Sequence, residues 1–418
     1  MLDSIYVGLT GLVGYSKSLK VISNNVANLN TPGFKSSQLQ FADLFYSDQG
    51  ANTANADGSA RFGTGLNTLQ TTFDFKQGEI RQTGNDLDAA LDGNGLFVLK
   101  SKTGDLRFTR AGEFGFDADG FLVSRATSER VMGLGDDGNL VDISLNGIRV
   151  NAPKATAKVS FSGNLSSTAD TDEIDSVKVI DALGGQHLLK LVFKNNATAP
   201  VTPPDPGAPA DPGAPPAPAG TPGEWTVTVS DEKGEIGTGT IQFQNGALVP
   251  GKSSFTLTYA PEGTTGTDIA FDFSKDTTSF SSGTQSTLAV GAQDGFAAGA
   301  LTKVSFDEQG NLVATYSNGQ TVKSHRLALA LFDRPDATLV GIGGNEFATQ
   351  GSSPVRFGNP GSDSFGKISS GNVEISNVDL SQEFSELIVT QRGYQASSQI
   401  ISTASELVQD LLDMRGKR

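Results

Sequence analysis

The chain has 418 residues, which is too long for one ordinary domain and predicts about two to four. Glycine is abundant at 50 residues and charged residues make up only 18%, a balance typical of β-rich proteins with many tight turns. The formal net charge of −15 disfavours general binding to nucleic acid or anionic membranes, and the absence of cysteine excludes disulfides, thiolate zinc sites and cysteine nucleophiles.

The N-terminal residues predict a long helix from about residue 3 to about residue 29. Its apolar side chains follow alternating three- and four-residue steps if Ser16 and Ser23 are counted as weak positions, and one more lies beside the stripe. These residues are Leu2, Ile5, Leu9, Leu12, Leu19, Ile22 and Val26. The seam indicates packing against another helix, although an ordinary amphipathic helix on a globular core gives the same pattern.

The stretch NNVANLNTPGFK, residues 24–35, predicts where this helix ends. Its four asparagines, Asn24, Asn25, Asn28 and Asn30, are poor helix formers because their side chains compete for backbone hydrogen bonds. Pro32 cannot continue the helix and biases Thr31 away from helical geometry. Gly33 then allows a sharp change of direction, with Phe34 expected to anchor the loop on a neighbouring molecule.

The middle of the chain changes to a period of two residues, which predicts short strands. The first β block includes residues 96–99, 106–109, 114–116 and 121–123, a second runs from about 155 to 290, and a third follows from about 303. Residues 198–223 are rich in proline, so we expect an exposed, partly extended insertion between two strands.

The C-terminal residues predict a second long helix. Leu380, Leu387, Tyr394, Ile401 and Val408 recur every seven residues, and Phe384, Ile388, Ala404, Leu411 and Leu412 widen the stripe. Ser381 with nearby Glu383 indicates the helix start. Neither terminal helix has a neighbouring helix in the sequence, so the two are expected to pair with each other, with copies of the same protein, or with both.

These elements predict a nested, mixed and mainly β fold, in which the long N- and C-terminal α-helices pair as a coiled-coil-like domain. The helical domain is expected to comprise residues 1–70 and 365–418, and a discontinuous β domain residues 71–150 and 291–364. Residues 151–290 are expected to form an outer β domain inserted in it, carrying the proline-rich segment 198–223.

Motifs for catalysis or metal binding are weak. The two histidines, His187 and His325, stand alone at the edges of strand-like runs, so neither is predicted as a metal ligand or nucleophile. DADG (117–120) and DDGN (136–139) lack the spacing and closing glutamate of a calcium loop, and hairpin turns explain both better. GNG (93–95) lacks a nucleotide-binding continuation, so a tight turn before a strand is favoured there. No catalytic residue, metal or cofactor is predicted.

Two longer segments and the helix-end stretch resemble the bacterial flagellar rod and hook protein family. NNVANLNTPGFK is similar to the family's N-terminal signature, and QGEIRQTGNDLDAALDGNGLFVL (77–99) is similar to the opening of its shared β domain, which FTRAGEFGFDADGFLV continues. Residues 377–412 resemble its C-terminal helix. FSGNL (161–165) and the large middle β block favour the hook members over the shorter rod members.

The resemblance implies a structural, non-enzymatic subunit that assembles into a flexible helical tube outside the cell. The tube joins rod to filament, transmits torque as a universal joint and encloses the export channel. The implied partners are other copies of the chain, the distal rod protein, the hook cap, the hook-filament junction protein and the flagellar type III export apparatus. Export by that apparatus fits the N-terminus, which lacks the basic start and continuous apolar core of a cleavable signal. No run of eighteen apolar residues predicts a membrane span.

Two alternatives remain at this point. A distal rod protein or another axial component belongs to the same class, and the length and inserted domain argue against it. An extracellular β-rich enzyme or glycan-binding module belongs to another class and needs a catalytic pair or an aromatic platform. A single tryptophan, Trp225, and only six tyrosines argue against such a platform.

Overall fold

The computed structural model describes residues 2–44, 46–48, 61–63, 65–196, 223–351 and 354–416. The chain divides into two compact units. Unit 1 comprises Met1–Asn146, Lys303–Ala314 and Thr321–Arg418, and unit 2 comprises Gly147–Thr302 and Thr315–Gln320. The proline-rich insertion lies outside the described residues except for Gly223, and the separation of unit 1 into a helical and a β domain stays a prediction.

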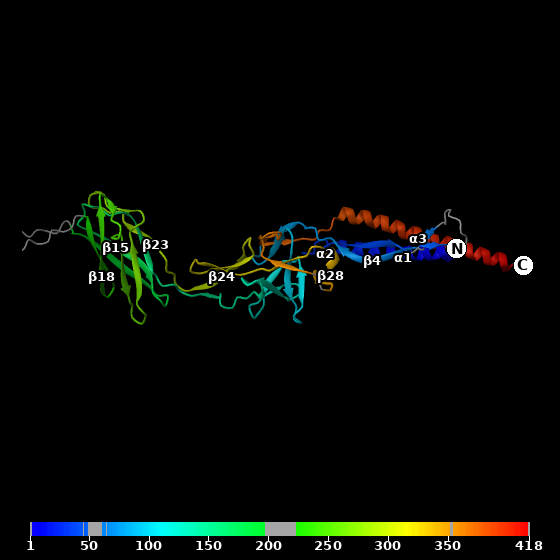
Figure 1. Ribbon diagram of the computed structural model, residues 1–418, viewed down its shortest axis with the longest axis horizontal. Coiled ribbons are helices and arrows are strands. Elements are labelled where there is room, and N and C mark those ends of the chain that lie inside the picture. The colour runs from blue at the N-terminus through cyan, green and yellow to red at the C-terminus, as the bar shows by residue number, and fades with distance from the viewer. Residues whose placement is uncertain are drawn as a thin grey trace, which may run out of the picture. The chain divides into compact units, whose positions relative to one another are not determined.

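Two long helices from opposite ends of the chain lie side by side in unit 1 (Figure 1). Helix α1 spans Leu2–Ala27 and helix α3 spans Leu380–Gly416. The carboxylate of Asp379 begins α3, because its Oδ1 accepts hydrogen bonds from the amides of Ser381 at 2.8 Å and Gln382 at 3.3 Å. The cap is therefore Asp379, two residues before the serine that the sequence pattern indicated.

A hairpin packs along α1 and connects it to the rest of unit 1. Its strands, β1 (Ser37–Asp43) and β4 (Leu66–Phe73), pair antiparallel with a bulge between Leu39 and Phe41. The short strands β2 (Tyr46–Asp48) and β3 (Arg61–Gly63) pair beyond it. The hairpin places the residues after α1 beside the start of α3.

The largest sheet of unit 1 among the described residues has the order β28-β29-β8-β7-β11-β10-β9, with β12, β27 and β30 joined at its sides. Its strands are β7 (Leu96–Lys100), β8 (Leu106–Thr109), β9 (Phe114–Phe116), β10 (Leu122–Ser124), β11 (Arg130–Leu134), β12 (Leu140–Asp142), β27 (Leu329–Leu331), β28 (Leu339–Gly343), β29 (Glu346–Thr349) and β30 (Arg356–Gly358). The one-turn helix α2 (Pro335–Thr338) precedes β28. Two further pairs join β5 (Ile80–Gln82) to β32 (Asn372–Glu374) and β6 (Ala89–Asp92) to β31 (Lys367–Ser370).

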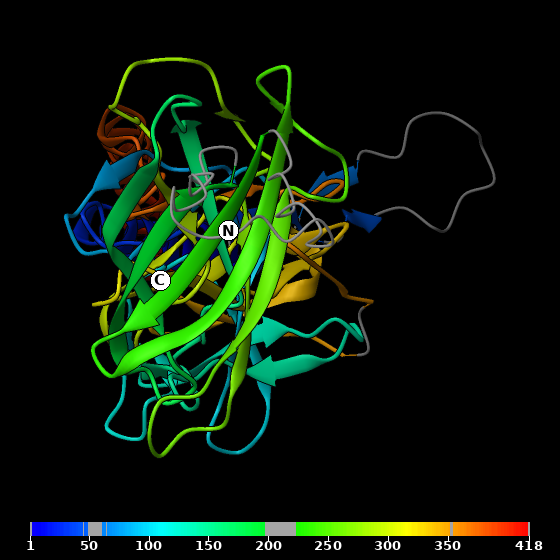
Figure 2. The same ribbon diagram turned by 90° about the vertical axis from the view of Figure 1, so that its left-hand side faces the viewer.

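Unit 2 is built around two five-stranded sheets, counted over the described residues. One has the order β15-β16-β17-β18-β19 and faces the viewer in green in Figure 2, and the other joins β20-β21-β14-β22 with β23. The bounds are β14 (Lys158–Asn164), β15 (Thr171–Ile180), β16 (Gln186–Asn195), β17 (Glu224–Asp231), β18 (Gly234–Gln244), β19 (Ala247–Leu248), β20 (Ser254–Tyr259), β21 (Thr267–Asp272), β22 (Thr277–Thr278) and β23 (Ala289–Gln293). A four-stranded sheet has the order β13 (Val150–Asn151), β24 (Gly299–Phe306), β25 (Asn311–Tyr316) and β26 (Thr321–Arg326); β13 belongs to unit 2 and β26 to unit 1.

Each unit has its own apolar core. Strand alternation turns every second residue of β16 and β17 inward, so that Leu191, Phe193, Trp225 and Val227 are each no more than 1% exposed in unit 2. In unit 1 the core forms around Val98, Phe108, Met132, Ala330 and Phe347. Because separate cores stabilise separate domains, the two units are expected to unfold independently.

The predicted turns are confirmed. The amide of Gly120 donates to Asp117 O at 3.1 Å in the turn between β9 and β10, and Gly120 has a φ of +85°. The amide of Asn139 donates to Asp137 Oδ1 in the turn between β11 and β12. The mainly β fold with paired terminal helices is confirmed as well. Among the described residues, no helix is long and apolar enough for a membrane crossing.

Candidate functional site

The face of α1 that meets α3 is lined by small residues. Gly8, Gly11 and Ser18 are buried on it, followed by Ile22. A Cβ atom built on Gly8 lies 2.9 Å from Ile401 Cγ1, and one on Gly11 lies 2.9 Å from Ser397 Oγ. Larger side chains at these positions displace α3, so the glycines allow the two helices to approach closely.

The opposing face of α3 follows the predicted seven-residue repeat. Thr390, Ser397 and Ala404 are buried, and the half-buried predicted seam residues alternate with them. These seam residues are Leu387, Tyr394, Ile401 and Val408. The ring of Tyr15 on α1 lies over Gly393, where a built Cβ is 2.6 Å from Tyr15 Cζ.

The other predicted seam residues are less enclosed within one chain. On α1, Ile22 is buried and Leu9 is 49% exposed, while the half-buried residues are Ile5, Leu12, Leu19 and Val26. The side chain of Leu2 lies outside the described residues. On α3, the exposed members are Leu380, Phe384 and Leu411.

A second apolar stripe runs along α3 beside the one that meets α1. Successive residues of this stripe are eleven, seven, four and three positions apart. Each of these steps is close to a whole number of helix turns, so the residues lie on one helix face. They are Val389, Ile400, Leu407, Leu411 and Met414, and each is 47–70% exposed. On α1, Tyr6, Leu9 and Val13 are also 45–54% exposed. We call the five α3 residues the outer stripe; of these, only Leu411 was part of the predicted seam.

Asn25 is the polar centre of the helix pair. Its side chain is 1% exposed, and its Nδ2 donates at 2.9 Å to both Ser37 O on β1 and Glu383 Oε1 on α3. Its Oδ1 accepts from the amide of Ser37 at 3.0 Å. Burial raises the pKa of Glu383, with the hydrogen bond from Asn25 acting in the opposite direction. A buried amide that needs all three partners holds two helices in one register.

The other asparagines of the helix-end stretch have local roles. Asn28 Nδ2 donates to Asn24 O at 2.9 Å, and Thr31 Oγ1 donates to Asn28 Oδ1 at 3.1 Å. Asn30 is exposed. Pro32 O accepts a hydrogen bond from Asn345 Nδ2 at 2.8 Å, which connects the stretch to the turn between β28 and β29.

Phe34 is buried within its own chain. It is only 9% exposed within its own chain, so the expectation that it anchors the loop on another subunit was wrong. The physical reason is that Gly33 turns the chain toward the β core of unit 1, where the apolar ring is removed from water at once.

Gly33 occupies a position that only glycine fits. Its φ is +70°, its amide donates to Glu374 O at 2.8 Å, and a Cβ built on it lies 2.3 Å from Ala111 N. We expect Gly33→Ala to lower the free energy of unfolding by more than the about 1–2 kcal/mol of the left-handed conformation alone, because the methyl group also collides with backbone. Urea denaturation measures the loss.

Gly84→Ala is the matched control for this substitution. Gly84 has a similar φ of +79°, yet a Cβ there meets nothing within 4 Å. Gly84→Ala therefore has the free-energy cost of the left-handed conformation but no collision of the added methyl group with backbone. Equal losses in the two variants would show that the backbone at Ala111 moves aside.

A buried ion cluster lies directly after Gly33. Lys35 Nζ is 2.6 Å from Glu374 Oε1, and Arg110 Nη1 is 2.9 Å from Glu374 Oε2. The amide of Gly78 also donates to Glu374 Oε1 at 2.9 Å, and Arg110 Nη2 donates to Gly93 O at 2.7 Å. The side chains of Lys35 and Glu374 are 0% exposed.

Two cations in this cluster share one carboxylate. Burial lowers the pKa of both Lys35 and Arg110, and the charge of Glu374 opposes the shift in each case. The cluster joins the segment after α1, the loop before β5, the end of β8 and strand β32. No local sequence signal indicated it, because its members come from distant parts of the chain.

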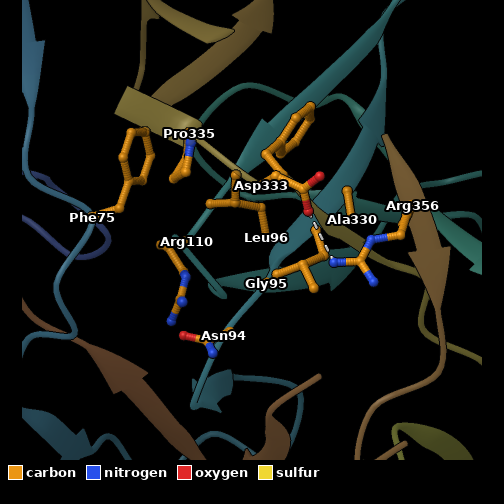
Figure 3. A pocket seen from close by; sticks show the side chains of 11 residues that line it. Phe75, Asn94, Gly95, Leu96, Arg110, Ala330, Asp333, Pro335 and Arg356 are labelled. Carbon is orange, nitrogen blue, oxygen red and sulfur yellow. Dashed lines mark hydrogen bonds and ion pairs between the residues drawn. The ribbon is translucent and has the colours of Figure 1, made fainter. Parts of the chain in front are cut away.

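A cavity of about 360 Å³ borders the cluster (Figure 3). Phe75, Leu96 and Pro335 supply apolar wall, and Arg110 reaches toward Asn94. Asp333 is the one carboxylate among the lining residues, and it is 3.0 Å from Arg356. The pair of carboxylates that a glycan hydrolase uses is therefore not among the residues that line it.

His187 serves local structure. His187 Nε2 is 2.8 Å from Asp181 Oδ2, and Asp181 also accepts from the amides of Leu183 and Gly185 in the turn between β15 and β16. Burial lowers the pKa of His325. The described residues contain no group of three or more His, Cys, Asp or Glu side chains arranged to hold a metal ion.

Three family models match the chain, and they define its class. The flagellar basal body rod FlgEFG C-terminal model matches residues 369–414, the flagella basal body rod protein model residues 5–35, and the flagellar hook protein FlgE/F/G D1 domain model residues 90–166. The matched segments include most of α1, most of α3 and the first β block. The class that these models describe is the rod and hook proteins of the bacterial flagellum.

Full-length relatives narrow the class. The chain is 30% identical to the flagellar hook protein FlgE of Brucella suis over 425 residues, covering 98% of each chain. It is 29% identical to that of Borreliella burgdorferi over 455 residues, covering 99% of this chain and 100% of the relative, and 29% identical to that of Salmonella typhimurium over 440 residues, covering 97% and 98%. The chain belongs to the flagellar hook protein family.

A solved structure is also similar. The crystal structure of Helicobacter pylori flagellar hook protein FlgE2 aligns with a TM-score of 0.49 at 16% identity, covering 69% of this chain and 98% of that one. Members of the hook family are structural proteins, so the chain is a structural component of the flagellum and not an enzyme. The predicted family and structural role are confirmed, and the rod and enzyme alternatives are not favoured.

Proposed function

We propose that the chain is the repeating subunit of the hook, and that copies join through the faces of α1 and α3 left exposed in the single chain. The observation that carries this proposal is the outer stripe of α3. A row of apolar side chains that are each 47–70% exposed keeps a continuous strip of nonpolar surface in water. Such strips mark interaction sites, and burial of each large side chain stabilises a contact by about 1.5–3 kcal/mol.

The arrangement of the helix pair supports a neighbouring copy as the occupant of the stripe. The inner face of α3 is already filled by α1, and Asn25 holds the two helices in register. The outer stripe repeats the seven-residue spacing of the inner face, which is the geometry that another helix fits. In a homopolymer, exposed apolar residues of α1 such as Tyr6 and Leu9 supply a complementary surface.

The finer parts of the proposal follow from the family. The polymer is a flexible helical tube outside the cell that joins rod to filament, transmits torque as a universal joint and encloses the export channel. Residues 1–70 and 365–418 form its polymerisation domain, residues 71–150 and 291–364 the next domain outward, and residues 151–290 the outermost. Its other partners are the distal rod protein, the hook cap, the hook-filament junction protein and the type III export apparatus.

The proposal predicts that charge on the outer stripe prevents assembly without unfolding the subunit. Val389→Glu places a carboxylate on a residue that is 70% exposed in the single chain. We expect the free energy of unfolding of the monomer to change by no more than about 0.5 kcal/mol, since surface substitutions are usually that mild. We expect tubes to disappear in electron micrographs at protein concentrations where the native chain forms them.

Gln391→Glu is the matched control. Gln391 is exposed and lies two residues further along α3, which places it on nearly the opposite face of the helix. The same new side chain should therefore leave tube formation intact. A second pair, Leu407→Glu and Gln409→Glu, repeats the comparison nearer the C-terminus. Tubes from Val389→Glu and Leu407→Glu would reject the outer stripe as the contact between copies.

A further inference from the structure

Two buried carboxyl groups in unit 1 share one arginine. Arg107 Nη1 on β8 is 2.6 Å from Glu129 Oε1, in the turn before β11, and 3.0 Å from Glu346 Oε2 on β29. Glu129 is 7% exposed and Glu346 is 2% exposed. The two carboxyl groups are therefore immediate neighbours, and both are largely removed from water.

When both acids are ionised, two of their four carboxylate oxygens lack a hydrogen-bond donor within the described part of the chain. Among the described residues, Glu129 Oε2 and Glu346 Oε1 have no hydrogen-bond partner. Ionised carboxylates only accept hydrogen bonds, so neither can satisfy the other. One proton removes the difficulty, because a protonated carboxyl donates to its neighbour and makes the two acids and Arg107 neutral as a group.

The surrounding charges favour this proton. Burial and the charge of Glu346 raise the pKa of Glu129 to about 7, with Arg107 acting in the opposite direction. The charges that act on Glu129 are thus Glu346 from β29 and Arg107 from β8, and Asp105 acts in turn on Arg107.

The pair lies where a hairpin joins the main sheet of unit 1. Glu346 pairs with Thr109 of β8, and Thr109 Oγ1 donates to Asn345 O at 2.8 Å. Asn345, in the turn between β28 and β29, donates through Nδ2 to Pro32 O at 2.8 Å. Whatever separates Glu346 from β8 therefore also disturbs the support of the helix-end stretch.

We propose that Glu129 and Glu346 form a proton-operated latch. With one proton shared between them, the pair holds the β28–β29 hairpin, and through Asn345 the segment after α1, against β8. When the proton leaves, two neighbouring buried carboxylates repel each other and the hairpin loosens. The function of the latch is to make the rigidity of this junction depend on the acidity around the protein.

The sign of the pH dependence is opposite to that of an ordinary ion-paired carboxylate. Because the pKa of Glu129 is raised from 4.5 to about 7 in the folded chain, folding retains a proton that the unfolded chain releases. The stability that the pair supplies is present at and below about pH 4.5 and is lost as the pH rises through about 7. Asp272, whose pKa is lowered to about 2 beside Lys158, shows the usual opposite case.

The test compares the full-length native chain with Glu129→Gln. The glutamine amide donates to Glu346 as the protonated acid does, and its oxygen accepts from Arg107, at every pH. We measure amide hydrogen exchange in β28 and β29, corrected for intrinsic rates, at about pH 4.5 and about pH 8.5. We expect equal protection at the lower pH, and at the higher pH at least about tenfold slower exchange in Glu129→Gln, a change in opening equilibrium that matches about one pKa unit of linkage.

Glu113→Gln is the control, because Glu113 is a carboxylate 37% exposed and 3.6 Å from Arg125. Its exchange should match the native chain at both pH values. A difference between Glu129→Gln and the native chain that is the same at both pH values overturns the latch. Slower exchange of the native chain on adding calcium or magnesium at the higher pH also overturns it, because a divalent cation rather than a proton then joins the carboxylates.

A direct titration keeps the proposal testable if Glu129→Gln does not fold. Native chain labelled with carbon-13 at the glutamate carboxyl groups is titrated by NMR. We expect one carboxyl signal to change with a midpoint near 7. If every glutamate signal titrates well below pH 6, the latch is rejected.

Discussion

Replacing Glu374 with alanine is expected to have the largest effect on unit 1. The substitution leaves Lys35 and Arg110 buried without the carboxylate that both contact, and removing one partner of a buried ion pair typically costs about 3–5 kcal/mol. Arginine cannot discard its proton to relieve the cost. We expect the transition of unit 1 in circular-dichroism melting to move to lower temperature or to vanish.

The control for Glu374→Ala is Asp333→Ala. Asp333 is also ion-paired, 3.0 Å from Arg356, but the two side chains are 77% and 62% exposed. Exposed pairs contribute about 0–1 kcal/mol, so this variant should melt nearly as the native chain does. If the melting temperature of unit 1 falls by the same small amount in both variants, water enters the cluster and the burial of its charges has no consequence for stability.

Trp225→Ala is expected to have the corresponding effect on unit 2. Trp225 is 1% exposed in the core between the two sheets, and truncation of a buried aromatic residue to alanine costs about 3–5 kcal/mol. We expect hydrogen exchange to rise across β14 to β23 and to stay native in α1, α3 and the sheet around β7. Trp225→Phe keeps most of the buried surface and should lose much less.

The two variants together test the division of the chain. Trp225 is the single tryptophan of the chain, so its fluorescence reports unit 2 alone. In Glu374→Ala, circular dichroism should detect unfolding of unit 1 at a temperature where the tryptophan emission is still native. Simultaneous changes in both signals would mean that the units unfold as one.

The sequence predicts the helices and strands well because their signals are local. A seven-residue repeat from Leu380 to Val408 indicates a helix face without knowledge of its partner, and α3 presents that face to α1. The end of α1 is equally local, since Pro32 and the asparagines decide it within one turn. These features depend on backbone preferences that each residue carries with it.

The face of α1 that meets α3 has no local signal in the sequence. Gly8 and Gly11 make the helices fit because they lack side chains, and a hydrophobic pattern records only the side chains that are present. The apolar residues that define the seam, such as Leu9, partly face outward instead. Sequence periodicity therefore identifies the apolar stripe but not which of two partners, the same chain or a neighbour, covers it.

The ion cluster and the carboxyl pair could not be predicted from the sequence. Lys35 and Glu374 are 339 positions apart, and Arg107 and Glu346 are 239 positions apart. Charges with such separations in the sequence come together only because the topology of the sheet places their strands side by side. The sequence shows each of these residues as one more polar position near a turn.

Asn25 and Glu383, 358 positions apart, have a consequence for timing. A chain that is delivered N-terminus first, as a ribosome delivers it, presents α1 long before α3. The hydrogen bond from Asn25 to Glu383 can then form only after the last part of the chain has arrived. Unit 2 has all but a few of its residues within Gly147–Thr302 and can fold earlier. Because such distant contacts form slowly, α1 has the β1–β4 hairpin as a partner early but lacks α3 until delivery is complete, and the helix pair forms only when the final residues arrive.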